Sequence, residues 1–358
     1  MPARLPPQSL PRGEATPGRE GNPLNSQSRF AFIVGAPRCG TTTLAGFLQQ
    51  HPEVCFSAVK EPHFFSGADL DGLNEQQINR VVDQEYLGRF FGQCDGNEKL
   101  RAEGSVTYLY APERMAPILQ LWPDAKFVIA LRDPLAMLPS LHQRLLVTGD
   151  ENITDFRKAW AKIDDRAKGK SIPRSAIDPR FLRYDEAGAL GRHVEKFLAA
   201  VGRERCHIVL FDDLASDPGA TYRDLCHFLD LEPWPETKLK ARRVNMTFRI
   251  GWLQRLLKRP PKAVRTVLAG EKFRTREKQL GAGEGRAIKA IFAVRKRLLD
   301  WNKVPAKREP LDPAVRQQII DQLRDDVIHL SRVLDRDLSH WLGGVPEANP
   351  MAQKDLSN

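Results

Sequence analysis

The nine-residue loop from Gly35 to Thr43, Gly-Ala-Pro-Arg-Cys-Gly-Thr-Thr-Thr, has the residue types of an anion-binding turn. It follows the apolar run Phe30–Val34 and precedes a helical pattern, Leu44–Gln50. Glycines let the backbone approach an anion closely, and a turn of this kind directs several backbone N–H groups at one point. The N-terminus of the following helix adds partial positive charge. We therefore expect a phosphate-binding turn between a strand and a helix, with Arg38 as its cation.

The position of that cation distinguishes the loop from a nucleoside-triphosphate loop. In the Walker A pattern, Gly-x4-Gly-Lys-(Ser/Thr), the lysine after the second glycine neutralises the β- and γ-phosphates. Here Thr41 follows Gly40, and Arg38 comes two residues before that glycine. We therefore expect an anionic ligand shorter than a triphosphate tail.

A carboxylate and an imidazole two residues apart form a second candidate site in the segment Lys60-Glu61-Pro62-His63-Phe64-Phe65. A short strand is predicted just before it, at residues 53–57. Glu61 and His63 can then face one cleft and take a proton from a reacting group. The alternative is that Glu61 pairs with Lys60 or Arg101 while His63 packs in the core.

A second anion site is predicted where the buried strand Lys126–Leu131 ends. Arg132 follows that strand directly, and Ser140 lies about two turns into the next predicted helix, Leu135–Val147. Arginine can bind an anion with a bidentate fork, and serine with its hydroxyl. Two anion sites on one sheet edge match a bisphosphorylated nucleotide better than a triphosphate. The alternatives are an ion pair of Arg132 with Asp133, or a helix cap, and a surface position for Ser140.

The elements that position these residues alternate between strands and helices. Such alternation predicts an α/β fold with a central parallel sheet and helices on both faces, and ligands in such sheets bind at the carboxyl ends of the strands. We predict one domain at residues 29–345. Residues 1–28, with six prolines and no apolar signal-peptide core, and residues 346–358 are predicted to be disordered. No apolar run reaches the length of about 18 residues that a membrane span needs.

Taken together, residues 30–342 resemble sulfotransferases that use 3′-phosphoadenosine 5′-phosphosulfate (PAPS). The glycine loop is similar to their 5′-phosphosulfate loop, and Arg-x-Pro followed by Ser is similar to their 3′-phosphate site. The resemblance implies a P-loop-like α/β fold, PAPS as the sulfuryl donor and no metal. It implies that the donor is bound by Arg38, Cys39, Gly40, Thr41, Thr42, Thr43, Arg132 and Ser140, with weaker signals at Tyr184, Arg243 and Asn245. A core position is the alternative for Tyr184.

Glu-x-His-Phe-Phe resembles the base-bearing segment of heparan sulfate sulfotransferases and bacterial relatives. The resemblance implies that Glu61 is the base and that His63 orients the acceptor or shares its proton. A base formed by His63 alone, as in the small-molecule branch of the family, is the alternative. Residues 103–108 resemble the family's Glu-Lys-(Ser/Thr)-Pro-x-Tyr segment, but Gly104 replaces the usual lysine, which argues against a heparan-like acceptor.

Basic residues are concentrated in one region. The formal net charge is +10, and residues 240–308 alone contribute +17, so the rest of the chain carries −7. Such a local excess favours one contact with something anionic over general nucleic-acid binding. Apolar residues recur at helical spacing in this region, which predicts amphipathic basic helices. We expect them to contact the acceptor (a glycan, lipid or small molecule) or an anionic membrane surface; a solvated helical cap is the alternative.

The five cysteines are scattered, without a Cys-x-x-Cys pair. This pattern predicts neither a disulfide framework nor a zinc site, and it favours a reducing, cytoplasmic location. The function predicted from the whole sequence is a PAPS-dependent sulfotransferase acting on a hydroxyl or amine. The alternatives are a nucleotide-dependent kinase, for which Asp133 is the sole candidate magnesium ligand, and a non-enzymatic protein that binds membranes or nucleic acid.

Overall fold

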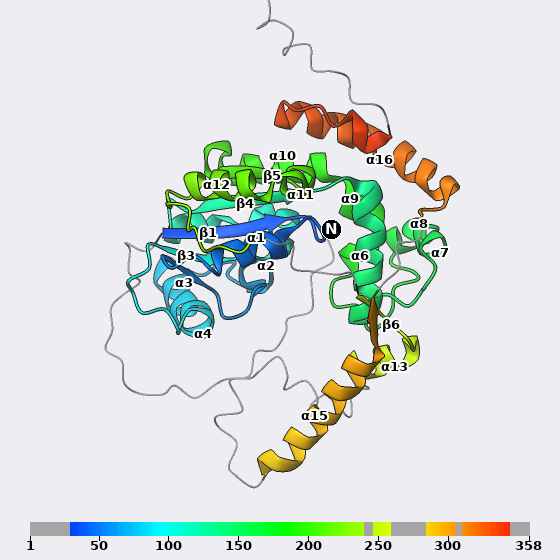
Figure 1. Ribbon diagram of the computed structural model, residues 1–358, viewed down its shortest axis with the longest axis horizontal. Coiled ribbons are helices and arrows are strands. Elements are labelled where there is room, and N and C mark those ends of the chain that lie inside the picture. Colours follow the sequence, from blue (N-terminus) through cyan, green and yellow to red (C-terminus); the bar gives the residue numbers. More distant parts are fainter. Residues whose placement is uncertain (1–28, 240–245, 259–283, 306–309, 344–358) are drawn as a thin grey trace, which may run out of the picture. The chain divides into compact units, whose positions relative to one another are not determined.

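The computed structural model of the chain describes residues 29–239, 246–258, 284–305 and 310–343 (Figure 1). These residues belong to two compact units, each of which is described by itself. Unit 1 contains the described residues within 29–137, 189–239 and 323–343, and unit 2 contains those within 138–188, 246–258, 284–305 and 310–322.

Unit 1 is built on a five-stranded sheet in the order β2-β3-β1-β4-β5, in which every neighbouring pair is parallel. Its strands are β1 (Arg29–Gly35), β2 (Val54–Phe56), β3 (Leu100–Glu103), β4 (Lys126–Leu131) and β5 (Cys206–Leu210). Strand β1 lies at the centre, so the loop that follows it opens at the middle of the carboxyl edge. The predicted α/β fold with a central parallel sheet is confirmed.

The helices of unit 1 follow the strands in alternation. They are α1 (Thr41–Leu48), α2 (Phe64–Gly67), α3 (Glu75–Val81), η1 (Val82–Leu87), α4 (Gly88–Phe90), η2 (Val106–Tyr110), η3 (Pro112–Arg114), α5 (Ala116–Leu121), α10 (Leu190–Val201), η5 (Arg203–Arg205), α11 (Phe211–Ser216), α12 (Pro218–Phe228) and η8 (Ser339–Leu342). Two helices belong to both units along the chain, α6 (Pro134–Thr148) and α16 (Pro313–Leu334).

Unit 2 consists of helices and one short antiparallel strand pair. Its remaining elements are α7 (Phe156–Trp160), α8 (Ile163–Ala167), η4 (Pro179–Leu182), α9 (Tyr184–Gly188), β6 (Met246–Phe248), α13 (Gly251–Lys258), α15 (Glu284–Asn302) and β7 (Lys303–Pro305).

Strand β1 is apolar from Phe30 to Val34 because both faces of the sheet are covered there. Side chains alternate between the faces of a strand, so Phe30 and Phe32 point to the same side. On that side Phe30 stacks on Trp122 at a ring distance of 3.9 Å, and Phe32 stacks on Phe127 at 5.5 Å. The intervening Ala31 and Ile33 are also fully buried. The sheet core therefore fixes the edge from which the candidate site is built.

One cysteine prediction is wrong, because Cys55 and Cys94 form a disulfide between β2 and the segment after α4. Among the described residues, Cys39, Cys206 and Cys226 are free and buried. The sequence pattern could not show this pairing, since the two cysteines are 39 residues apart and meet only in the folded chain. The cysteines therefore no longer support a reducing compartment, and the cytoplasmic location stays a prediction.

Candidate functional site

The glycine loop between β1 and α1 depends on backbone conformations that few residues adopt. Gly35 has a φ of 116° and Gly40 a φ of 90°, both in the left-handed region. A Cβ atom on Gly35 would lie 2.2 Å from the carbonyl oxygen of Ala130, and one on Gly40 would lie 2.6 Å from Leu214. Gly35 is therefore required for packing as well as for the turn, and Gly40 is required for the turn.

Helix α1 begins at Thr41, with Gly40 as its N-cap residue and no side-chain hydrogen bond capping this end. The first N–H groups of a helix have no partner inside it, and they carry the positive end of its dipole. Thr41, Thr42 and Thr43 form this first turn, where the Thr43 N–H donates to the Gly40 carbonyl at 2.8 Å. The start of α1 can therefore donate backbone N–H groups to an anion.

The structure brings Arg132 to the glycine loop, as predicted from the strand ends. Its guanidinium donates to the backbone carbonyl of Arg38 at 3.3 Å and lies 4.1 Å from the centre of the Phe211 ring. The neighbouring Asp133 accepts from the Leu135 N–H at 2.8 Å and so caps α6. Both predicted arginines of unit 1 are thus anchored at the same loop.

The neighbour of Arg38 in the loop, Cys39, is fully buried. Burial raises the pKa of its thiol far above the ordinary value, which keeps it neutral. Its contribution to the site is therefore through the backbone.

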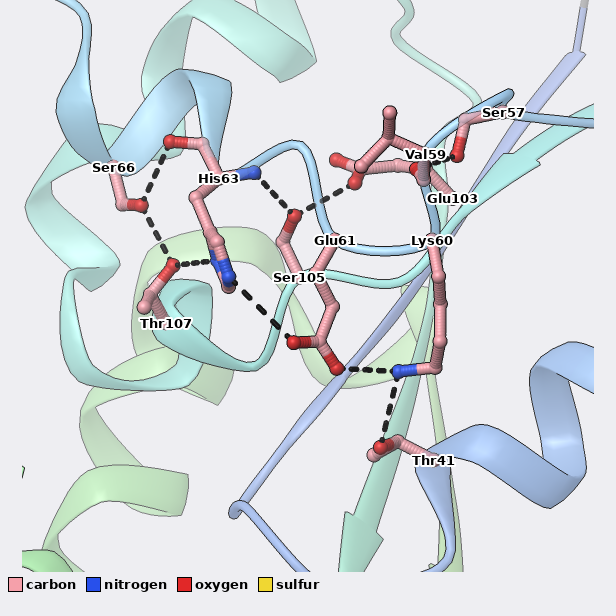
Figure 2. A network of polar contacts seen from close by, with 10 residues as sticks. All are labelled: Thr41, Ser57, Val59, Lys60, Glu61, His63, Ser66, Glu103, Ser105 and Thr107. Atoms are coloured by element: carbon pink, nitrogen blue, oxygen red, sulfur yellow. Dashed lines mark hydrogen bonds and ion pairs between the residues drawn. The ribbon is translucent and has the colours of Figure 1, made fainter. Parts of the chain in front are cut away.

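Figure 2 shows the second predicted site, which lies next to the first turn of α1. The Lys60 ammonium is 2.5 Å from one carboxylate oxygen of Glu61 and 3.4 Å from the Thr41 hydroxyl. The other Glu61 oxygen lies 3.7 Å from Nε2 of His63. Lysine therefore links the candidate base to the candidate anion site.

These contacts change the acidity of Glu61. Burial by itself would raise the pKa of its carboxyl, but the interactions with His63 and Lys60 outweigh burial and lower the pKa to about 2. Glu61 is consequently ionised at neutral pH and is a weak base. A carboxylate of this kind is well suited to stabilise a neighbouring cation.

Lys60 is the functional residue that the sequence interpretation missed, since it considered this lysine only as an ion-pair partner of Glu61. The pair exists, but the contact of Lys60 with Thr41 depends on the path of the loop after β2. Arg101, the other partner considered, pairs with Glu98 at 2.8 Å. The His63 side chain is 38% exposed, so it is not a core residue.

The segment after β3 holds the backbone of His63 in place. His63 has a φ of 55°, and its N–H donates to the Ser105 hydroxyl at 2.9 Å. Ser105 in turn donates to a carboxylate oxygen of Glu103 at 2.7 Å. The Gly104 N–H donates to the Lys60 carbonyl at 2.9 Å. The two conspicuous sequence segments, 60–65 and 103–108, therefore form one structure.

Glu103 is fully buried behind this turn. Its second carboxylate oxygen has no hydrogen-bond partner among the described residues. Burial raises the pKa of the Glu103 carboxyl to about 7, against opposing interactions with Ser105 and Tyr108. The folded protein therefore holds a proton on Glu103 at pH values where an exposed glutamate has lost it.

Replacing this carboxyl by its neutral isostere in Glu103→Gln should change how stability depends on pH. The stabilising effect of the raised pKa is present in full below the ordinary value of about 4.5, and it is lost as the pH rises through about 7. The substitution should therefore favour the folded state by about 2.5 kcal/mol more at pH 8 than at pH 5, because part of the effect is already lost at pH 5. Urea unfolding of both proteins at the two pH values measures this. If the two proteins differed in their free energy of unfolding by the same amount at pH 5 and at pH 8, the raised pKa of Glu103 would be contradicted.

Other predicted residues lie elsewhere. Ser140 is in the part of α6 that belongs to unit 2. Tyr184 is fully buried in unit 2, where its hydroxyl donates to Glu151 at 2.9 Å. This environment favours the alternative of a core tyrosine. Arg243 and Asn245 lie outside the described residues.

Two other kinds of feature are absent from the described ranges. No group of three or more His, Cys, Asp or Glu side chains there could hold a metal ion. No helix in those ranges is both long enough and apolar enough to cross a bilayer.

The chain is similar in sequence to known sulfotransferases. A sequence model described as the sulfotransferase family matches residues 112–236. Over these residues the chain is similar to that family. The match includes Arg132 but begins after the glycine loop and the Glu61–His63 segment. For those two segments, the support comes from the structure itself.

Two relatives and one solved structure illustrate the similarity. The chain is 25% identical over 247 residues to protein-tyrosine sulfotransferase A of Caenorhabditis elegans, a match that covers 65% of this chain and 57% of that protein. It is 57% identical over 248 residues to carbohydrate sulfotransferase 15 of Rattus norvegicus, covering 57% of this chain and 44% of that protein. The chain thus spans about half the length of these relatives.

A crystal structure of a sulfotransferase from Alicyclobacillus acidocaldarius superimposes with a TM-score of 0.55 at 24% identity, covering 87% of this chain and 97% of that chain. At this identity the likeness concerns the fold.

Proposed function

We propose that this protein transfers a sulfuryl group from PAPS to a hydroxyl or amine of an acceptor. One observation carries the proposal: Lys60 contacts both Thr41, in the first turn behind the glycine loop, and Glu61 of the Glu61–His63 pair. A single lysine therefore contacts both the anion-binding turn and the proton-accepting pair. A direct transfer between donor and acceptor requires the two to be this close.

In this proposal the loop N–H groups, Arg38, Thr41 and Thr42 hold the 5′-phosphosulfate, and Arg132 and Ser140 hold the 3′-phosphate. The start of α1 supports this assignment, because no side chain caps it and its first N–H groups can donate to an anion. Lys60 supplies a second cation close to the group that is transferred.

The acceptor loses its proton to the Glu61–His63 pair while its oxygen or nitrogen lone pair forms the new bond to sulfur. The bond between sulfur and the bridging oxygen breaks, and its electron pair stays on the 5′-phosphate of the departing 3′-phosphoadenosine 5′-phosphate. Arg38 and Lys60 stabilise the charge that develops on that oxygen. Catalysis is thus positioning, charge stabilisation and one proton transfer.

Ligand-induced thermal shift separates this proposal from its alternatives. A ligand that binds only the folded state raises the melting temperature. We expect 3′-phosphoadenosine 5′-phosphate to stabilise the protein in the absence of Mg²⁺, and ATP with Mg²⁺ to have little effect. Stabilisation by ATP–Mg²⁺ alone would favour the kinase alternative. No shift with either nucleotide would favour a non-enzymatic protein.

Arg132→Ala and Ser140→Ala should each weaken binding of PAPS while largely sparing adenosine 5′-phosphosulfate, which lacks the 3′-phosphate. Loss of a hydrogen bond to a charged group typically costs about 1.5–3 kcal/mol, so we expect a decrease of about 10-fold or more. Calorimetric titration with both nucleotides measures the difference. Equal losses for both would remove these two residues from the 3′-phosphate site.

A carbohydrate hydroxyl is the acceptor that we propose first. Carbohydrate sulfotransferase 15 and protein-tyrosine sulfotransferase A, as named, act on two different acceptor classes. A panel of glycans, tyrosine peptides and phenols, assayed with labelled donor, decides between them. Transfer to the peptides or phenols alone would contradict a glycan acceptor.

An anionic membrane surface is a second partner that we propose, based on helices α13 and α15 of unit 2. Their buried side chains include polar ones as well as Leu299. Asn302 donates to Gln254 at 3.2 Å, and Arg295 donates to the Leu257 carbonyl at 2.9 Å. Their exposed side chains include large apolar ones, Trp252, Leu256, Val294, Leu298 and Trp301. Exposed apolar side chains beside basic ones are typical of helices that lie on anionic membranes.

The combined variant Arg255→Glu, Lys296→Glu and Arg297→Glu should lose binding to vesicles that contain anionic lipid, because these exposed cations supply the attraction. Affinity for 3′-phosphoadenosine 5′-phosphate should stay the same. Cosedimentation at low and high salt measures the effect, with Arg80→Glu on α3 as the control. If the unmodified protein shows no salt-sensitive binding, these helices form a solvated cap.

A further inference from the structure

A chain of hydrogen bonds links the imidazole of His63 to its own backbone carbonyl through two hydroxyl groups (Figure 2). Nδ1 of His63 lies 2.9 Å from the Thr107 hydroxyl, and that hydroxyl lies 2.7 Å from the Ser66 hydroxyl. Ser66 lies 3.1 Å from the His63 carbonyl oxygen. Three contacts therefore share the hydrogens of two hydroxyls and one ring nitrogen.

The carbonyl oxygen at the end of this series of hydrogen bonds determines the direction in which the hydrogens are donated. A carbonyl oxygen can only accept, so Ser66 must donate its single hydrogen to His63 O. Ser66 then accepts from Thr107, and Thr107, having used its own hydrogen, can only accept from Nδ1. In the opposite direction the contact between Ser66 and the carbonyl would have no hydrogen. Only one direction thus gives every contact a hydrogen, and it requires a proton on Nδ1.

We propose that Thr107 and Ser66 are positioning residues that fix the Nδ1–H tautomer of His63, which leaves Nε2 as the atom that takes the acceptor's proton. This inference rests on the proposed function. Nε2 is the nitrogen that faces the site, 3.7 Å from the Glu61 carboxylate. When Nε2 gains the proton, the ring becomes a cation beside that carboxylate, and the Nδ1–H bond to Thr107 remains.

The charged groups around His63 act mainly on the protonated ring. Glu61 is an anion held by Lys60, and its oxygen lies 3.7 Å from Nε2, which is longer than a hydrogen bond. It therefore stabilises the ring once Nε2 has gained a proton, and it competes with the hydroxyl groups for the tautomer only through its charge. The buried Glu103 also interacts electrostatically with His63. Ser105, two residues after Glu103, accepts a hydrogen bond from the His63 N–H. Thr107 is 8% exposed, so water does not readily replace its hydroxyl. The tautomer is therefore determined mainly by the two hydroxyl groups.

Nitrogen-15 NMR of the folded protein tests the tautomer without any substrate. The two ring nitrogens of a neutral imidazole have well-separated shifts, and the His63 signals are identified by their loss in His63→Gln. At about pH 9, where imidazole is neutral, we expect the proton on Nδ1 in the unmodified protein. Thr107→Val and Ser66→Ala should both move it toward Nε2. The effect of Ser66→Ala is the sharper test, because Ser66 does not contact the ring, and its loss frees Thr107 to donate to Nδ1.

Activity gives the second readout. Loss of one neutral hydrogen bond corresponds to a change of up to about 10-fold, so kcat should fall about 10-fold in Thr107→Val and Ser66→Ala. Affinity for 3′-phosphoadenosine 5′-phosphate should not change, and Thr107→Ser should restore both kcat and the tautomer. Thr221→Val is the matched control, since Thr221 is a buried threonine of unit 1 whose hydroxyl donates to Asp217 O on the first turn of α12.

Two results would overturn the inference: an Nε2–H tautomer in the unmodified protein, or unchanged nitrogen shifts in both variants. If the protein instead lacks sulfotransferase activity while the shifts behave as expected, the proposed function fails and the tautomer assignment stands.

Discussion

Arg38→Ala should lower turnover by about 100-fold or more, because Arg38 is the cation of the loop that holds the proposed donor. Removing one preorganised donor of charge stabilisation from an active site typically has an effect of this size. The loss should appear in kcat more than in donor affinity, since the charge on the bridging oxygen develops only as the S–O bond breaks. Steady-state kinetics together with nucleotide titration separate the two effects.

The backbone of Arg38 requires its own control. Arg38 has a φ of 73°, a left-handed conformation that asparagine tolerates better than alanine. Arg38→Asn should therefore lose as much activity as Arg38→Ala with less loss of stability, whereas Arg38→Lys should retain part of the activity. Arg80→Ala, at an exposed arginine of α3, controls for the loss of a positive charge elsewhere. Near-normal turnover of folded Arg38→Ala would remove Arg38 from the mechanism.

The parts of the fold that the sequence predicted are those with local causes. The run Phe30–Val34 is apolar because β1 is buried on both faces, and Gly40 is required because its φ is 90°. Arg132 could be placed at the loop because parallel strands bring their carboxyl ends to one edge. Each of these inferences uses residues that are neighbours in the chain or in the sheet.

The parts that it did not predict depend on distant segments. The Cys55–Cys94 disulfide depends on how the chain folds back between two cysteines 39 residues apart. The link from Lys60 to Thr41 depends on the loop path after β2, and the hydrogen-bond chain on His63 depends on its left-handed φ of 55°. No period or motif encodes such angles when the residue is not glycine.

The Glu61–His63 pair offers the second large expected effect. His63→Ala should lower kcat by about 1,000-fold, within the range for loss of a general base, and Glu61→Gln by about 100-fold. The larger loss is expected for His63→Ala because the two groups differ in how readily they accept a proton. Glu61, with a pKa of about 2, is a weak base, whereas Nε2 of His63 is free to accept a proton if Nδ1 carries one. Glu61 then acts as the anion that stabilises the protonated ring.

Both variants should bind 3′-phosphoadenosine 5′-phosphate as the unmodified protein does, because a base acts on the acceptor. Single-turnover kinetics with preformed donor complex measure the chemical step, and calorimetry measures nucleotide binding. An active His63→Ala beside an inactive Glu61→Gln would make Glu61 the direct base and would also contradict the role given to Thr107 and Ser66.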